Sequence, residues 1–141
     1  MKRIITICLG LLAYACASAS ALDNIVPKPN KAELTKGSIR ISGMGLKCDT
    51  SLDEASFQAI NRFAAQLSLV SGKASAAAPA FGLAQSVANG NAKGMIFLMD
   101  PGKGEEEYSI SVGDKAVIVK ASGLNGFLYA LQTIRQMLIC S

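Results

Sequence analysis

Few residues of this chain could carry out chemistry. The sequence has 141 residues, with no histidine and no tryptophan. Without histidine, neither a Ser-His-Asp or Cys-His catalytic group nor a histidine-ligated metal can be built, whereas carboxylate, serine, lysine and cysteine chemistry stays possible. The acidic cluster Glu105-Glu106-Glu107 is one candidate for a cation site or a carboxylate pair. Because consecutive side chains point in different directions, a solvated loop before a strand at Tyr108 is the favoured interpretation.

Two glycine-containing segments and one acidic pair are weaker candidates. The segment Pro101–Gly104 lacks the spacing and the Lys-Ser/Thr pair of a phosphate-binding loop, so it predicts a turn. The segment Gly43–Gly45 lacks the third glycine of a dinucleotide-binding motif. In the adjacent pair Asp53-Glu54, Glu54 is expected to form a helix-capping box with Ser51. The sequence therefore predicts no catalytic, cofactor-binding or metal-binding residue in this chain.

The first 21 residues have the pattern of an export signal. Lys2 and Arg3 precede an apolar stretch over 4–17, and small residues up to Ala21 provide an A-x-A cleavage site. The stretch is shorter than the roughly 20 residues that a transmembrane helix needs. We therefore expect cleavage after Ala21 and a periplasmic or extracellular location. A lipoprotein signal, with Cys16 as the lipidated residue, is the alternative.

The mature region, residues 22–141, is long enough for one domain. Removal of the signal leaves twelve basic and ten acidic residues. This small positive excess does not indicate a nucleic-acid-binding surface. Cys48 and Cys140 also remain, and they could pair or stay as two separate thiols, of which separate thiols are favoured.

Four strands are expected in the mature region. Alternation around Ile39 and Ile41 predicts the first strand, and a continuous apolar run from Met95 to Met99 predicts a fully buried one. Two further alternating runs flank Gly113-Asp114 and predict a hairpin. The region 73–93 is rich in small residues without a sustained period and predicts a loop with at most one weak turn. The expected strands span residues 36–42, 94–99, 108–112 and 116–121.

Two long helices are expected, over residues 52–70 and from Phe127 to the end. Their apolar side chains recur at intervals of three and four. In the last helix a second apolar side, with Leu128, Tyr129 and Ile139, exceeds what one sheet face covers, so this helix is expected to contact another partner as well. The expected fold is α+β, with a mainly antiparallel sheet and two long helices packed on one face, in the order β-α-β-β-β-α.

Three segments together resemble a known domain. They are residues 25–29 followed by Gly37 and the Ile39/Ile41 strand, residues 107–121, and residues 121–138, where a small-residue turn leads into a helix. The most specific residues are Gly126, Gln132, Thr133 and Gln136. Taken together, these segments resemble the N-terminal, non-catalytic domain that precedes the catalytic barrel of glycoside hydrolase family 20 β-N-acetylhexosaminidases.

The resemblance implies an accessory role. In that family the chemistry belongs to an Asp-Glu pair on the (β/α)₈ barrel, where the substrate's own acetamido group attacks the anomeric carbon. The chain would then be a signal peptide and one α+β domain, truncated before the barrel, inactive alone and without a cofactor. Leu128, Tyr129 and Ile139 would face the barrel, and the glycan would be contacted only through it.

Two other functions stay open. One is a free-standing exported module that binds glycans or a protein, although Phe57, Phe63, Phe97 and Phe127 fall on predicted core faces rather than on a sugar-binding surface. The other is the equivalent domain of a different carbohydrate-active enzyme family.

Overall fold

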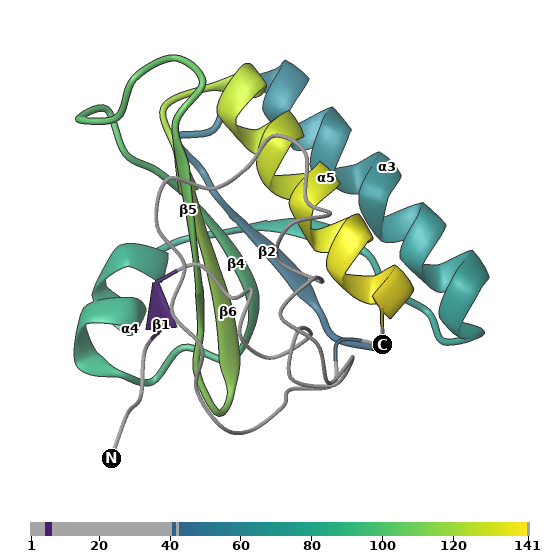
Figure 1. Cartoon of the computed structure of the whole chain (residues 1–141). Coiled ribbons are helices and arrows are strands. Elements are labelled where there is room, and N and C mark those ends of the chain that lie inside the picture. The colour runs from purple at the N-terminus through teal and green to yellow at the C-terminus, as the bar shows by residue number, and fades with distance from the viewer. Residues whose placement is uncertain (1–4, 7–40, 42, 141) are drawn as a thin grey trace.

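A mixed sheet with helices on both faces forms the folded part of the chain (Figure 1). The computed structural model describes residues 5–6, 41 and 43–140. Most of the predicted signal segment 1–21 and of the predicted strand 36–42 lies outside these described residues.

The sheet contains six strands in the spatial order β1-β5-β6-β4-β2-β3. β2 pairs in parallel with β3 and β4, and β4 pairs in parallel with β6. β5 is antiparallel to both β6 and β1. The strands are β1 (Ile5–Thr6), β2 (Leu46–Asp49), β3 (Ala77–Ala80), β4 (Gly94–Met99), β5 (Tyr108–Val112) and β6 (Ala116–Ala121).

The prediction of a mainly antiparallel sheet is wrong, because only the hairpin β5-β6 and the two-residue β1 pair in that way. Helices connect β2 to β3 and β3 to β4. A helical crossover returns the chain to the same end of the sheet, so the strands that it joins run in parallel. The hairpin itself, predicted around Gly113-Asp114, is confirmed.

In the described part of the chain, three helices cover the sheet. The long helices α3 (Glu54–Ser71) and α5 (Leu124–Cys140) lie side by side on one face, as predicted (Figure 1). The short helix α4 (Leu83–Asn89) covers part of the opposite face. The prediction of a loop over 73–93 is therefore wrong, because this region contains both β3 and α4. Both are short and built mainly from small residues, so neither produces a readable apolar period.

The start of α3 differs from the predicted capping box. Asp53 is the N-cap residue, and its carboxylate accepts hydrogen bonds from the Ser56 amide (3.2 Å) and the Ser56 hydroxyl (2.6 Å). The hydroxyl of Ser51 instead donates to Asp49 (2.8 Å). Glu54 is the first helical residue. Aspartate caps a helix as well as serine does, and it also favours the positive end of the helix dipole.

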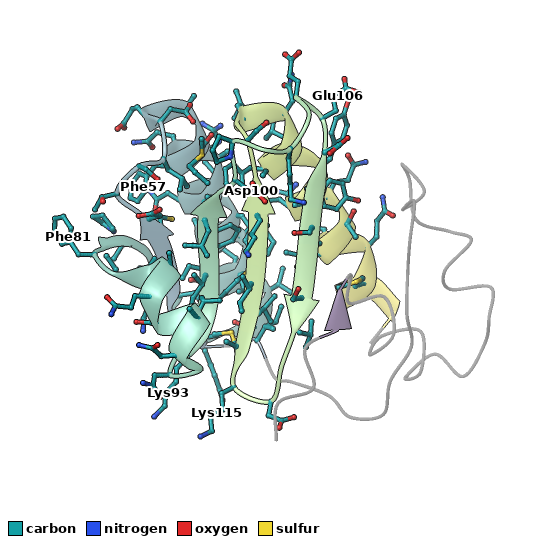
Figure 2. All side chains as sticks on the ribbon, turned by 90° about the vertical axis from the view of Figure 1, so that its left-hand side faces the viewer. Phe57, Phe81, Lys93, Asp100, Glu106 and Lys115 are labelled. Atoms are coloured by element: carbon teal, nitrogen blue, oxygen red, sulfur yellow. The ribbon has the colours of Figure 1, made fainter. Side chains whose placement is uncertain are left out.

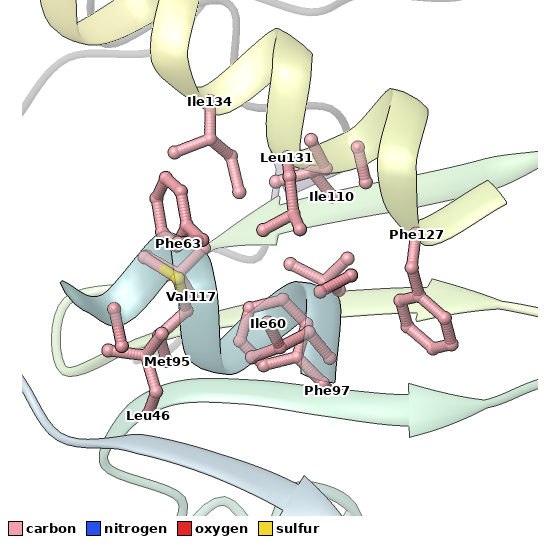
Figure 3. Packing of buried hydrophobic residues seen from close by; sticks show 14 of the residues in the cluster. Leu46, Ile60, Phe63, Met95, Phe97, Ile110, Val117, Phe127, Leu131 and Ile134 are labelled. Carbon is pink, nitrogen blue, oxygen red and sulfur yellow. The ribbon is translucent and has the colours of Figure 1, made fainter. Parts of the chain in front are cut away.

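The main core lies between the sheet and the α3-α5 pair (Figure 3). Alternate residues of β4, β5 and β6 point into it, since successive side chains of a strand face opposite sides. The Phe97 ring from β4 meets the Phe127 ring from α5, with centroids 6.3 Å apart and planes tilted by 60°. A second, smaller cluster under α4 contains Leu83, Ile96, Leu98, Ala116 and Ile118.

The Asp53 cap predicts a specific pH dependence of stability. Its hydrogen bonds from Ser56 lower the pKa of the carboxyl group below its ordinary value. Because the pKa is lower in the folded state, the stabilisation is present above the unfolded-state pKa of about 4 and is lost as the pH falls through the folded-state pKa. Asp53→Asn keeps a capping oxygen but does not titrate.

We expect the free energy of unfolding, measured in urea at about pH 5 and pH 3, to fall less for Asp53→Asn than for the wild type. Asp114→Asn, at an exposed turn, is the control and retains the wild-type slope. Equal slopes for wild type and Asp53→Asn would contradict the cap as the source of this dependence.

Candidate functional site

The outer face of the α3-α5 pair is poor in charge. α3 carries the charged residues Glu54 and Arg62, and α5 carries Arg135 alone. Leu128 leaves 42% of its surface exposed on this face, and the neighbouring Tyr129 is half-buried. A helical layer with so few charged side chains is unusual where water is the only neighbour, and it is typical of a surface that packs against another protein unit.

The structure places the predicted contact residues of α5 as follows. Leu128 and Tyr129 both lie away from the buried stripe formed by Phe127, Leu131 and Ile134. Ile139 lies in the last turn of α5, and its side chain falls outside the described residues.

A polar contact joins the two helices of this face. Nε of Arg135 donates to the side-chain oxygen of Gln66 on α3 (3.1 Å). The guanidinium carbon of Arg135 also lies 5.5 Å from the centroid of the Phe63 ring. Such a cation–π contact contributes about 0.5–1 kcal/mol at an exposed position. Arg135 therefore helps to hold α3 and α5 in a fixed relation.

The start of α5 packs closely against the loop between β4 and β5. A side chain at Gly126 would place its Cβ 2.6 Å from the backbone oxygen of Glu107 and 2.8 Å from the Cβ of Ala121. The Ser122 hydroxyl donates to the Gly104 carbonyl (2.9 Å). The contact at Gly126 explains why a glycine occupies the first turn of α5.

A partly buried pair of hydroxyl groups joins α5 to β5. Thr133 donates its hydroxyl hydrogen to the Tyr129 carbonyl (3.0 Å), so the Tyr108 hydroxyl is the donor in its 2.6 Å bond to Thr133. Gln132 is exposed on the other side of α5. The adjacent residues Gln132 and Thr133 therefore lie on different sides of α5.

An open depression of about 580 Å³ lies beside the start of α5, lined by residues of the β4-β5 loop and of 122–125. Lys103 lies there and pairs with Asp100 at 3.9 Å. The segment 101–104 forms a turn, as predicted. Glu105, Glu106 and Glu107 are exposed in the loop before β5, also as predicted. No group of three or more potential metal ligands occurs within the described residues.

Cys48 in β2 is a free, fully buried thiol. Burial raises its pKa to about 12. Because the thiolate is the reactive form, this side chain is inert at neutral pH. Cys140 ends α5, and its side chain lies outside the described residues.

Three exposed apolar side chains were not expected from the sequence. The interval of three from Leu67 predicts a buried Val70, but 88% of its surface is exposed, because the last turn of α3 projects past its core contacts. Its neighbour Leu69 is 85% exposed. Phe81, directly after β3, is 88% exposed (Figure 2), whereas the predicted core rings Phe63, Phe97 and Phe127 are buried and Phe57 is half-buried.

Comparisons with known proteins agree on one family. The sequence profile described as "Glycosyl hydrolase family 20, domain 2" matches residues 23–139. A family 20 exo-β-N-acetylglucosaminidase from Vibrio harveyi, solved with N-acetylglucosamine, is similar over 82% of this chain and 16% of its own, with 22% identity and a TM-score of 0.58. An inactive mutant of that enzyme gives 21% identity and a TM-score of 0.59, over the same shares of the two chains.

The chain thus spans about one sixth of the length of these solved enzymes. No curated protein matches the sequence. Within the described residues, no helix is both long and apolar enough to cross a membrane.

The close approach at Gly126 predicts a position-specific cost. Gly126→Ala forces its Cβ against the Glu107 carbonyl, and we expect a loss of about 1–3 kcal/mol in the free energy of unfolding. Gly123→Ala, directly before α5, is the control, because a Cβ there meets nothing within 4 Å. Urea unfolding of both variants measures the difference. Equal stability of the two variants would show that the loop moves aside freely.

Proposed function

The chain belongs to glycosyl hydrolase family 20 through its domain 2, and from this membership we propose that it is the accessory domain of an exported β-N-acetylhexosaminidase. In such an enzyme the terminal N-acetylhexosamine is hydrolysed on a catalytic barrel, with the substrate's acetamido group as the nucleophile. The present domain contributes no reacting group and contacts the glycan only through that barrel.

The observation that carries this proposal is the outer face of the α3-α5 pair. Leu128 is partly exposed there, and only three charged residues occur along the two helices. Interfaces between protein units are depleted of charged residues at their centre and keep polar groups at their rim. Gln132 and Arg135 fit such a rim. We therefore assign this face to the barrel, with Leu128, Tyr129 and Ile139 as contact residues.

Such packing would act on stability rather than on chemistry. Covering the Leu128 side chain removes apolar surface from water, and each Å² contributes about 25 cal/mol. The barrel would be stabilised in the same way, because its own apolar surface in the interface is also removed from water. The accessory domain would thus hold the barrel folded, while residues 1–21 direct the enzyme to the periplasm or the exterior.

One observation favours a second function, a free-standing glycan-binding module. Phe81 presents an exposed ring, and aromatic rings stack on the apolar faces of sugars. The other phenylalanines are buried or half-buried, so Phe81 would act without an aromatic neighbour. Binding of N-acetylglucosamine oligomers that disappears in Phe81→Ser would favour this module.

The accessory role predicts that the purified chain is inactive. We expect no turnover of an aryl N-acetylglucosaminide above the uncatalysed rate, because the chain supplies no acid/base pair. Turnover that persists through purification would contradict the proposal. The nucleotide sequence beyond codon 141 gives an independent test, since the proposal expects it to encode a barrel.

The uncovered helix face also predicts dye binding. We expect the purified chain to bind anilinonaphthalene sulfonate and to self-associate, and Leu128→Lys to reduce the fluorescence by more than half. Phe81→Ser, at an apolar side chain that is more exposed but lies outside the helix pair, is the control and leaves most of the signal. A monomeric, cooperatively unfolding chain that binds no dye would contradict the docking face.

A further inference from the structure

Most acidic side chains of the described residues lie at one of the two ends of the molecule. The carboxyl ends of β2, β4 and β6 share one end with the N-termini of α3 and α5, and the amino ends of the three strands form the other. Figure 2 shows Asp100 and Glu106 toward the first end and Lys93 and Lys115 at the second. Besides Asp114, the acidic residues in the described part of the chain all belong to the first end: Asp49, Asp53, Glu54, Asp100, Glu105, Glu106 and Glu107.

Three lysines lie at the opposite end. The Gly94 amide donates to the Lys115 carbonyl (3.1 Å), which places Lys115 next to Lys93. The amino end of β4 also contacts the segment 43–45, because Met95 donates to the Gly45 carbonyl (3.0 Å). The Lys73 side chain lies against Gly43, 3.3 Å from the position a Cβ would take there. One surface therefore joins the three lysines.

These lysines are available for a partner. Lys73, Lys93 and Lys115 are all exposed. None of them forms an ion pair with another residue of the described part. Asp114, in the hairpin turn, is the one carboxylate nearby in sequence.

Two apolar side chains accompany the lysines. Leu69 and Val70 are 85% and 88% exposed in the last turn of α3. Gly72 ends that helix in the left-handed conformation (φ 70°), and Lys73 follows directly. This surface thus combines exposed apolar groups with unpaired positive charge. We call it the basic end, and it consists of Leu69, Val70, Lys73, Lys93 and Lys115.

We propose that the basic end binds the surface of an anionic lipid bilayer. Lysines beside a bilayer are attracted to acidic headgroups, and apolar side chains between them can enter the boundary with the acyl chains. A polyanionic glycan or nucleic acid would use the lysines but would leave Leu69 and Val70 in water. The acidic end is repelled by the same surface, so the molecule binds in one orientation.

The docking face depends on Leu128 of α5, whereas the basic end combines the last turn of α3 with lysines that lie outside both helices. A domain held in this way brings the attached unit close to the membrane. The lysine contribution weakens at high salt, because exposed charges are screened over about 10 Å at 0.1 M ionic strength.

The test uses the full chain with vesicles of phosphatidylcholine, alone or with about 30% phosphatidylglycerol. We expect sedimentation with the anionic vesicles only, and release at high salt. Each lysine near such a surface contributes about fivefold in partitioning, so Lys93→Ser/Lys115→Ser weakens binding about 25-fold. The control Lys103→Ser/Lys120→Ser changes the net charge equally at the other end and keeps at least half of the binding.

The pair Leu69→Ser/Val70→Ser separates a bilayer from other polyanions. It should weaken vesicle binding at least fivefold and leave any retention on heparin unchanged. Equal binding to neutral and anionic vesicles, equal losses for the two lysine pairs, or heparin retention without vesicle binding would each overturn the proposal. All substituted side chains are exposed except Lys103 and Lys120, and circular dichroism verifies the fold of each variant.

Discussion

The burial of β4 on both faces is the constraint from which the architecture follows. Met95, Ile96, Phe97 and Leu98 are all at most 4% exposed, so apolar side chains leave this strand in both directions. Each direction needs a cover. α3 and α5 cover the side of Met95 and Phe97, and α4 covers the side of Ile96 and Leu98. These three helices supply the covers. α3 and α4 are the crossovers from β2 to β3 and from β3 to β4, strands that run parallel in the sheet, and α5 follows β6.

The sheet buries only one side of each of the two long helices, α3 and α5. A sheet face covers one stripe of each helix, and in α5 that stripe holds Phe127, Ala130, Leu131 and Ile134. The remaining surface is left with Leu128, Tyr129 and few charges. The same helices are fixed to each other through Arg135 and to the strands through Tyr108 and Thr133. The two helices therefore form a fixed surface with few charges. Such a surface suits a permanent interface with another protein unit better than a transient one.

Sequence patterns predicted the elements with strong periods and missed the weak ones. The strand 94–99, the hairpin and both long helices were predicted close to their observed bounds, because apolar spacing alone identifies them. β2 has only four residues, and β3 and α4 consist mainly of small side chains, so their positions depend on other elements. β2 pairs with β4, β3 pairs with β2, and α4 contacts β2 and β4. Strand direction was predicted wrongly, because no local pattern in β2 or β6 indicates which strand will pair with it.

The outward position of Leu128 was predictable from the width of the apolar stripe of its helix. The exposure of Val70 was not predictable, because it depends on where the last turn of α3 extends beyond the core.

Pro79 in the edge strand β3 limits how copies of the protein can associate. Leu46 donates to the Ala76 carbonyl (3.3 Å), and peptide groups alternate along a strand, so the nitrogen of residue 79 turns away from β2. Proline has no backbone N–H to donate at this position, so this edge of the sheet cannot pair fully with an additional strand. Copies that meet through their apolar helices would thus form reversible clusters, whereas growth of a continuous intermolecular sheet into fibres is blocked at this margin.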